Sequence, residues 1–206
     1  MLDPSAAQCY DSRVMISKPN TVTVGVLSDT HLPYRMDRLP DQIHQAFQDV
    51  DLILHAGDVD RIEYLDGLTS LAPLHAVRGN PHFKDFSDGG RDLPVEWQLT
   101  IAGHSVVVNH GGWPGFWSQA GDWFVQYLLR PGQDVLNQRI ANRLAQIYPQ
   151  ANLIVFGHSH RPYQSWHNRT LIFNPGAVCP TRRQVPSVGK VYLGPGTVEA
   201  EIISLV

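Results

Sequence analysis

The sequence predicts an α/β fold in which two packed mixed β-sheets are flanked by helices. Five short apolar runs have the length and composition of strands that are buried on both faces. Helical patterns lie between several of these runs, which is typical of a sheet covered by helices. Other segments are typical of β-hairpins, and this hairpin content indicates a second, antiparallel or mixed sheet packed on the first.

The predicted strands end where polar residues or glycines begin. The first covers residues 21–27 and stops directly before Ser28 and Asp29. The other apolar runs cover residues 51–55, 74–77, 106–108 and 153–156. Helical spacing predicts three helices, whose apolar faces consist of Ile43, Phe47 and Val50, of Ile62, Leu65, Leu68 and Leu71, and of Leu136, Ile140, Leu144 and Ile147.

Three predicted hairpins are separated by residues that favour turns. Residues 95–101 and 104–108 are joined by Ala102-Gly103. Residues 164–173 turn at His167-Asn168, and residues 190–205 turn at Gly194-Pro195-Gly196. This much hairpin content implies a second, antiparallel or mixed sheet packed on the first.

A chain of 206 residues is long enough for one domain with a sizeable core. Residues 1–20 show no clear period, so we predict a loose N-terminal extension before a single domain over residues 21–206. The extension lacks the apolar core of a signal peptide, and no run in the sequence is long enough to cross a bilayer. Cys9 and Cys179 lie far apart and form no CxxC pattern. We therefore expect a reducing, cytoplasmic location, with one bridge between them as the alternative.

The charge balance restricts the class of partner. The formal net charge is -3, from 16 Lys+Arg and 19 Asp+Glu. This balance argues against a dedicated nucleic-acid binder or an anionic-membrane binder, because both need a basic surface. A small anionic substrate remains compatible with it, since bound cations can reverse the local field.

Polar residues with ligand chemistry follow five of the predicted strands. Sites form where the carboxyl ends of strands converge in an open α/β sheet, so we expect these side chains to share one crevice. No single pair is specific, but five in succession, each at a strand end, are hard to obtain by chance. The seven candidate ligands are Asp29, His31, Asp58, Asn80, His110, His158 and His160.

This ligand set suits a pair of divalent metal ions. Imidazole and carboxylate together favour Mn, Fe, Co, Ni or Zn over Mg or Ca. A carboxylate such as Asp58 can bridge two ions and hold them about 3.5–4 Å apart. The alternative is that Asp29 and Asp58 only cap strand–helix turns, which would explain either residue but not the whole set.

The succession DxH, GD, GN, a histidine at a strand end and GHxH resembles the calcineurin-like metallophosphoesterases. The resemblance covers residues 21–205, and VRGN, GHSHRP and NPGA make it most similar to the small bacterial and archaeal phosphodiesterases. That branch also contains the retromer scaffold subunit. The resemblance implies the four-layer α/β/β/α sandwich of this family. It also implies one metal held by Asp29, His31, Asp58 and His160, and another held by Asp58, Asn80, His110 and His158.

The activity implied by the resemblance is hydrolysis of a phosphate ester by a hydroxide that two metal ions activate, with Mn as the first choice of metal. Many family members carry a histidine directly after GN that protonates the leaving group, whereas this chain has Pro81 there. We predict that His82 is the proton donor or a substrate contact, with a surface loop histidine as the alternative. Without an established general acid, good leaving groups are favoured.

Other residues have two interpretations each. Arg78 precedes Gly79 and is predicted either to contact substrate phosphate together with Asn80 or to form a structural salt bridge. Trp113 opens an aromatic segment that either stacks on a flat substrate or packs on the core or on a second subunit of a homodimer. Asp60 and Arg61 are expected to be a helix start and a solvated charge, with site residues as the alternative. His55 is expected to orient the loop that follows it.

The first functional prediction is therefore a binuclear phosphodiesterase that acts on small phosphate diesters. A phosphomonoesterase or nucleotide pyrophosphatase is the alternative enzyme, and the absence of the usual histidine at Pro81 weakly favours diesters. The alternative from another class is a non-catalytic metal-binding scaffold module. Scaffold members of the family lose ligands, and the retention of all seven here makes that alternative weaker.

Overall fold

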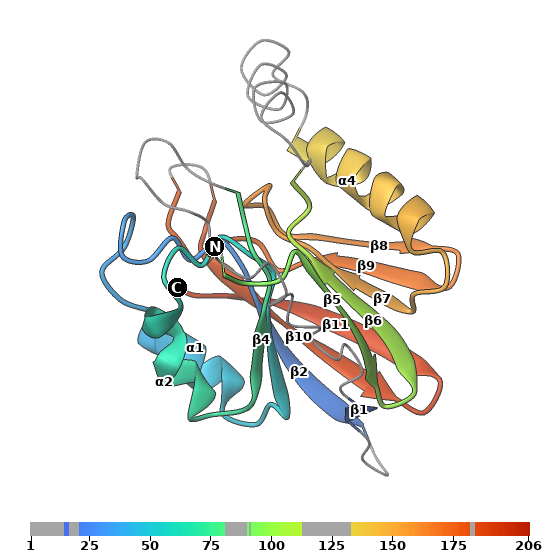
Figure 1. Ribbon diagram of the computed structural model, residues 1–206, viewed down its shortest axis with the longest axis horizontal. Helices are drawn as coiled ribbons and strands as arrows, with labels where there is room; N and C mark the ends of the chain where they lie inside the picture. Colours follow the sequence, from blue (N-terminus) through green and yellow to red (C-terminus); the bar gives the residue numbers. More distant parts are fainter. Residues whose placement is uncertain (1–14, 17–20, 81–89, 91, 113–132, 182–183) are drawn as a thin grey trace, which may run out of the picture.

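The computed structural model describes residues 15–16, 21–80, 90, 92–112, 133–181 and 184–206, and two β-sheets form its centre (Figure 1). The sheets pack face to face, with helices α1 and α2 on one outer face and α4 on the other. The four layers confirm the predicted α/β/β/α sandwich of two mixed sheets.

The five-stranded sheet has the order β11-β10-β2-β3-β4. Its parallel part, β2, β3 and β4, consists of the first three predicted strands. The predicted C-terminal hairpin, β10 and β11, pairs antiparallel to β2. The bounds are Val22–Leu27 for β2, Leu52–His55 for β3, Leu74–Ala76 for β4, Ser187–Gly194 for β10 and Thr197–Ser204 for β11.

The six-stranded sheet has the order β1-β5-β6-β7-β9-β8. The two other predicted hairpins form β5–β6 and β8–β9, and β7 lies between them, parallel to both β6 and β9. The bounds are Met15–Ile16 for β1, Glu96–Ile101 for β5, His104–Asn109 for β6, Leu153–Val155 for β7, Tyr163–His167 for β8 and Thr170–Asn174 for β9.

Helices form at the three predicted places, although two of their apolar faces are shorter than expected. Helix α1 covers Asp41–Phe47 and α4 covers Gln133–Ile147, whereas the second segment is a 3-10 helix η1 at Ile62–Leu65 that continues as α2 at Asp66–Thr69. Ile62 is 46% exposed and Ile147 is 56% exposed, so both leave the predicted buried faces. Each lies at an end of its segment, Ile62 at the start of η1 and Ile147 at the end of α4.

Three apolar cores separate the four layers. The largest lies between the sheets and contains valines and leucines of both, such as Val24 and Val108. A second core packs Ile43 and Phe47 of α1 on the outer face of the five-stranded sheet. In the third, Ile140 and Leu144 of α4 pack on the outer face of the six-stranded sheet. Strands covered on both faces explain the continuous apolar runs of the sequence.

Two glycines leave space for aromatic rings that cross between layers. A Cβ at Gly189 of β10 would lie 2.4 Å from Cζ of Phe173, which reaches over from β9 in the opposite sheet. A Cβ at Gly25 of β2 would lie 3.0 Å from the ring of Phe47 in α1. Both rings are fully buried. Glycine at these strand positions therefore permits the close approach of neighbouring layers.

Met15 and Ile16 belong to the segment that was predicted as a loose extension, yet they pair in parallel with Thr100 and Ile101. This part of the segment thus joins the edge of the six-stranded sheet, and the other residues of 1–20 lie outside the described residues. Among the described helices, none combines the length and apolar character that a bilayer crossing requires. The single domain over residues 21–206 stays a prediction.

We expect Gly189→Ala to lower the free energy of unfolding by about 1–3 kcal/mol, because the added methyl group collides with the Phe173 ring. Truncating that ring in Phe173→Leu should reduce the cost of Gly189→Ala, which equilibrium urea denaturation of both single variants and the double variant will measure. Gly67→Ala is the control, because Gly67 lies in α2 and a Cβ there would have its nearest neighbour at 3.6 Å. Equal costs with and without the full ring would contradict this packing.

Candidate metal centre

The seven predicted ligands lie on five loops, each of which follows the carboxyl end of a strand. Strands β2, β3 and β4 of one sheet contribute Asp29, His31, Asp58 and Asn80, and strands β6 and β7 of the other contribute His110, His158 and His160. Backbone hydrogen bonds join neighbouring loops, from Asp29 N–H to Gly57 O and from Gly157 N–H to His110 O. Both sheets therefore deliver side chains to one edge of the sandwich.

Four of the seven side chains form a compact, mostly buried group. One ligand atom from each of Asp29, His31, Asp58 and His160 lies within 4.8 Å of the others. Nε2 of His31 is 3.3 Å from Nε2 of His160 and 3.5 Å from Oδ2 of Asp58. Nε2 of His160 is 3.2 Å from Oδ1 of Asp29. These atoms surround a point where one cation could contact all four groups.

The other predicted ligands form a second group, which contacts the other oxygen of the Asp58 carboxylate. Nε2 of His110 is 3.4 Å from Oδ1 of Asp58, and the rings of His110 and His158 have centroids 5.3 Å apart. Nδ2 of Asn80 is 2.9 Å from Nδ1 of His158. The two oxygens of Asp58 thus face imidazoles of different groups. The structure thus brings all seven residues together around the Asp58 carboxylate, and their role as metal ligands stays a prediction.

The backbone carries unusual conformations at these residues. The φ angle is 54° at Asp29, 50° at His31, 56° at Asp58, 68° at His158 and 58° at His160. Residues other than glycine rarely adopt these left-handed values, and each costs about 1–3 kcal/mol. Such strain persists only where the surrounding structure imposes it, and it is concentrated at functional sites.

Glycine at position 79 is required by the packing of the loop after β4 on Asp58. A Cβ there would lie 1.9 Å from Oδ1 of Asp58 and 2.2 Å from its backbone nitrogen. The neighbouring Asn80 N–H donates to the same Oδ1 at 2.7 Å. The GN pair therefore brings an amide donor against the carboxylate, which no residue with a side chain at position 79 would allow.

A buried polar network holds the loop that carries His158 and His160. Oγ of Ser159 donates to Oδ1 of Asn137 at 2.7 Å, and Nδ2 of Asn174 donates to the carbonyl of Gly157 at 2.9 Å and to Oγ of Ser159 at 3.0 Å. Sequence reasoning assigned no role to Asn137, because an asparagine within a helical pattern gives no signal of its own. Asn174 had a signal in the NPGA motif.

His55 contacts two ligand loops, one of which is the loop that it was expected to orient. Burial lowers the pKa of His55 to about 4, so the ring is neutral. Its Nδ1 accepts the Gly57 N–H at 3.2 Å, which places the ring proton on Nε2, 3.2 Å from Oγ1 of Thr30. The ring thus connects the loop after β3 with the loop after β2.

The electrostatics of the cluster favour positive charge between the side chains. Burial alone would lower the pKa of His110, but the Asp58 carboxylate raises it to about 9. Burial likewise opposes ionisation of Asp29 and His160, yet each stabilises the charge of the other, so the pKa of Asp29 is lowered and that of His160 is raised. Oδ1 of Asp29 and Nε2 of His110 are buried and make no hydrogen bond within the described part of the chain. Both observations fit the donor set of a cation site.

The structure contradicts the expectation that Asp60 starts a helix. Asp60 is 5% exposed and its Oδ2 lies 3.5 Å from Nδ1 of His31. Its signal in the sequence is the repeat of an aspartate two residues after Asp58. Arg61 is a solvated charge as expected, 3.4 Å from Glu63.

The remaining predicted residues are placed only in part. Arg78 is half-buried, and its backbone N–H donates to the carbonyl of Pro94 at 2.7 Å. The contact of its side chain with substrate stays a prediction. His82 and Trp113 lie outside the described residues, and their predicted roles stay predictions as well.

Comparisons with known proteins agree on one family. The model of the calcineurin-like phosphoesterase superfamily domain matches residues 22–193. The chain is 31% identical over 183 residues to a probable metallophosphoesterase of Methanothermobacter thermautotrophicus, over 87% of this chain and 91% of that protein. It is 25% identical over 173 residues to a phosphodiesterase of Methanocaldococcus jannaschii, over 81% of this chain and 90% of that protein.

A solved structure supports the same fold. Vacuolar protein sorting 29 of Cryptosporidium parvum aligns with a TM-score of 0.62 and 17% identity, over 89% of this chain and 97% of that chain. At this identity the likeness concerns the fold alone. The family match, in contrast, spans most of the chain and includes every strand end that carries a candidate ligand. The resemblance predicted from the sequence is confirmed: the chain belongs to the calcineurin-like phosphoesterase superfamily.

Proposed function

We propose that the protein is a phosphodiesterase that hydrolyses small phosphate diesters with two divalent metal ions. The observation that carries this proposal is the position of Asp58, whose Oδ2 lies 3.5 Å from Nε2 of His31 and whose Oδ1 lies 3.4 Å from Nε2 of His110. A carboxylate that faces two separate imidazole groups is the arrangement needed to bridge a metal pair. When bound, such ions polarise phosphoryl oxygens and lower the pKa of water.

The chain's own residues divide into two proposed ligand groups. Asp29, His31 and His160 would hold one ion together with Asp58, while Asn80, His110 and His158 would hold the other together with it. Nδ1 of His110 faces the carbonyl of Ala56 at 2.8 Å, so its Nε2 is the nitrogen that points into the site. The mixture of imidazole, amide and carboxylate supports Mn as the first candidate, with Fe, Co, Ni and Zn as the others.

A diester substrate is supported by the sequence around Asn80 and by one relative. Pro81 replaces the histidine that many family members use to protonate a leaving group, so the chain supplies no general acid at that position. The relative in Methanocaldococcus jannaschii is named a phosphodiesterase. Cytoplasmic location, a homodimer and the absence of membrane or nucleic-acid partners are proposals that rest on sequence composition and the aromatic segment alone.

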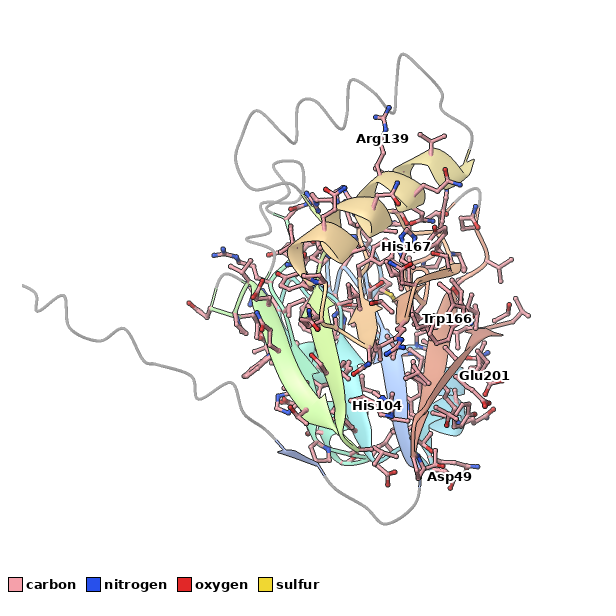
Figure 2. All side chains as sticks on the ribbon, turned by 90° about the vertical axis from the view of Figure 1, so that its right-hand side faces the viewer. Asp49, His104, Arg139, Trp166, His167 and Glu201 are labelled. Atoms are coloured by element: carbon pink, nitrogen blue, oxygen red, sulfur yellow. The ribbon has the colours of Figure 1, made fainter. Side chains whose placement is uncertain are left out.

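The first test is metal-dependent hydrolysis of bis(p-nitrophenyl) phosphate by protein that has been stripped of metal and then supplied with Mn. We expect activity to return with Mn and to exceed that on p-nitrophenyl phosphate. Asp58→Asn should lower kcat by more than the about 10–100-fold that is typical when a residue hydrogen-bonded to a metal ligand is changed, because the proposed bridging carboxylate loses its charge. Asp49→Asn, an exposed aspartate after α1, is the matched control and should retain full activity (Figure 2).

The outcomes separate the alternatives. Faster hydrolysis of the monoester would favour a phosphomonoesterase, and hydrolysis of nucleotide diphosphate bonds alone would favour a pyrophosphatase. Tight binding of two ions without any hydrolysis would favour the scaffold module. Failure to bind Mn, Fe, Co, Ni or Zn would contradict the metal centre itself.

A second test uses the space beside Gly79. We expect Gly79→Ala to displace the Asp58 carboxylate, because the new methyl group would overlap Oδ1. The metal content after dialysis, measured by mass spectrometry, should fall below that of the wild-type protein. Gly67→Ala adds the same methyl group in α2, where its nearest neighbour is Nε2 of His44 at 3.6 Å, and should keep full metal content. Full metal content in Gly79→Ala would show that the loop can move without cost and would contradict this packing.

A further inference from the structure

We propose that Asp60 is a positioning residue that orients His31 for its metal ion. This inference rests on the proposed metal centre and extends it to a residue outside the seven predicted ligands. The carboxylate of Asp60 lies behind the His31 ring, with Oδ2 at 3.5 Å from Nδ1. The side chains of both residues are completely shielded from solvent.

The two nitrogens of the His31 ring face different surroundings. Nε2 points towards the cluster, 3.3 Å from Nε2 of His160 and 3.5 Å from Oδ2 of Asp58. A neutral imidazole that binds a metal through Nε2 carries its proton on Nδ1. That proton then faces Asp60, and a carboxylate in this place fixes the tautomer, restricts ring rotation and makes Nε2 a stronger ligand.

The backbone holds Asp60 in this place independently of any metal. The segments after β2 and β3 run side by side, and Leu32 and Asp60 form a parallel bridge. The φ angle of Asp60 is 64°, a left-handed value like those of Asp58 and His31. Aspartate tolerates this conformation better than most residues. The chain thus adopts a costly conformation at a residue that is not itself one of the predicted ligands, which points to the carboxylate as its purpose.

A capping role does not account for Asp60. The N-cap of the following 3-10 helix is Arg61, and that cap makes no side-chain hydrogen bond. Capping residues at the start of a surface helix are also exposed, whereas Asp60 is buried beside His31. The position of the carboxylate is therefore better explained by the histidine than by the helix.

The second ligand group is oriented in a different way. Nδ1 of His110 faces a backbone carbonyl, that of Ala56, at 2.8 Å. A carbonyl fixes the tautomer but carries no full charge, so of these two described histidines it is His31 whose Nδ1 faces the charge of a carboxylate. Loss of the Asp60 charge should consequently lower the affinity for the ion that His31 would bind, and it should leave the affinity for the ion at His110 unchanged.

The test measures metal affinity directly, without reference to catalysis. Mn or Zn is titrated into metal-free protein in competition with a chelator, which gives a dissociation constant for each ion. We expect Asp60→Asn to raise the dissociation constant of one of the two ions by about 10–100-fold, and Asp60→Ala to raise it further. The dissociation constant of the second ion should stay within twofold of the wild-type value. Asp49→Asn, the same chemical change at an exposed aspartate, should change neither constant.

A second measurement needs no variant and therefore does not depend on whether Asp60→Asn folds. In the Zn-loaded wild-type protein, long-range proton–nitrogen NMR spectra of the histidine rings report which nitrogen carries the proton. We expect the proton of His31 on Nδ1. A proton on Nε2 would overturn the proposal, because the ring would then present the wrong nitrogen to the metal.

The outcomes distinguish this inference from the proposed function. If the wild-type protein binds metal and Asp60→Asn binds both ions as tightly, Asp60 has no positioning role while the metal centre stands. An equal loss at both ions would indicate a general structural role and would also overturn the proposal. If the wild-type protein binds none of the metals, the metal centre and this inference fail together.

Discussion

The Asp58 carboxylate between two groups of imidazoles is the arrangement on which the rest of the site depends. A buried negative charge is costly unless other groups compensate it, and here the compensation comes from the His31 and His110 rings and from the Asn80 N–H. These partners lie on three further loops. The position of one side chain thus requires correct placement of strands β2, β4 and β6 around β3.

The sandwich supplies this placement through its cores. Apolar contacts between the sheets and beneath the helices hold the strands in place. The loops at the carboxyl ends of the strands contain the strained backbone conformations of the site. Five of the seven candidate ligands have left-handed backbone conformations, which a flexible loop would relax. Stability gained from burial in the layers therefore maintains a strained, charged cluster at one edge.

Buried polar side chains that contact the ligand loops distinguish these loops from ordinary connections. The Asn137, Ser159 and Asn174 network fixes the loop with two histidines, and the neutral His55 ring joins two others. Asp60 stands in the same relation to His31. Each of these polar groups is buried, and each lies against a ligand or against the backbone that carries one. The site thus consists of the candidate ligands and of a second set of side chains that contact them, and the candidate ligands are the easier to recognise in the sequence.

The sequence by itself determined the layers, most strand positions, the hairpins and the seven residues that come together, because hydrophobic periodicity and short polar motifs at strand ends are local signals. Tertiary structure alone decided that Asp60 lies behind His31, that Asn137 of α4 supports a loop far along the chain, and that Ile62 and Ile147 leave their predicted faces. It also decided that Met15 and Ile16 join a sheet edge. Apart from the two exposed isoleucines, these features are contacts between residues distant in sequence, and no local pattern encodes which segments the packing of two sheets will bring together.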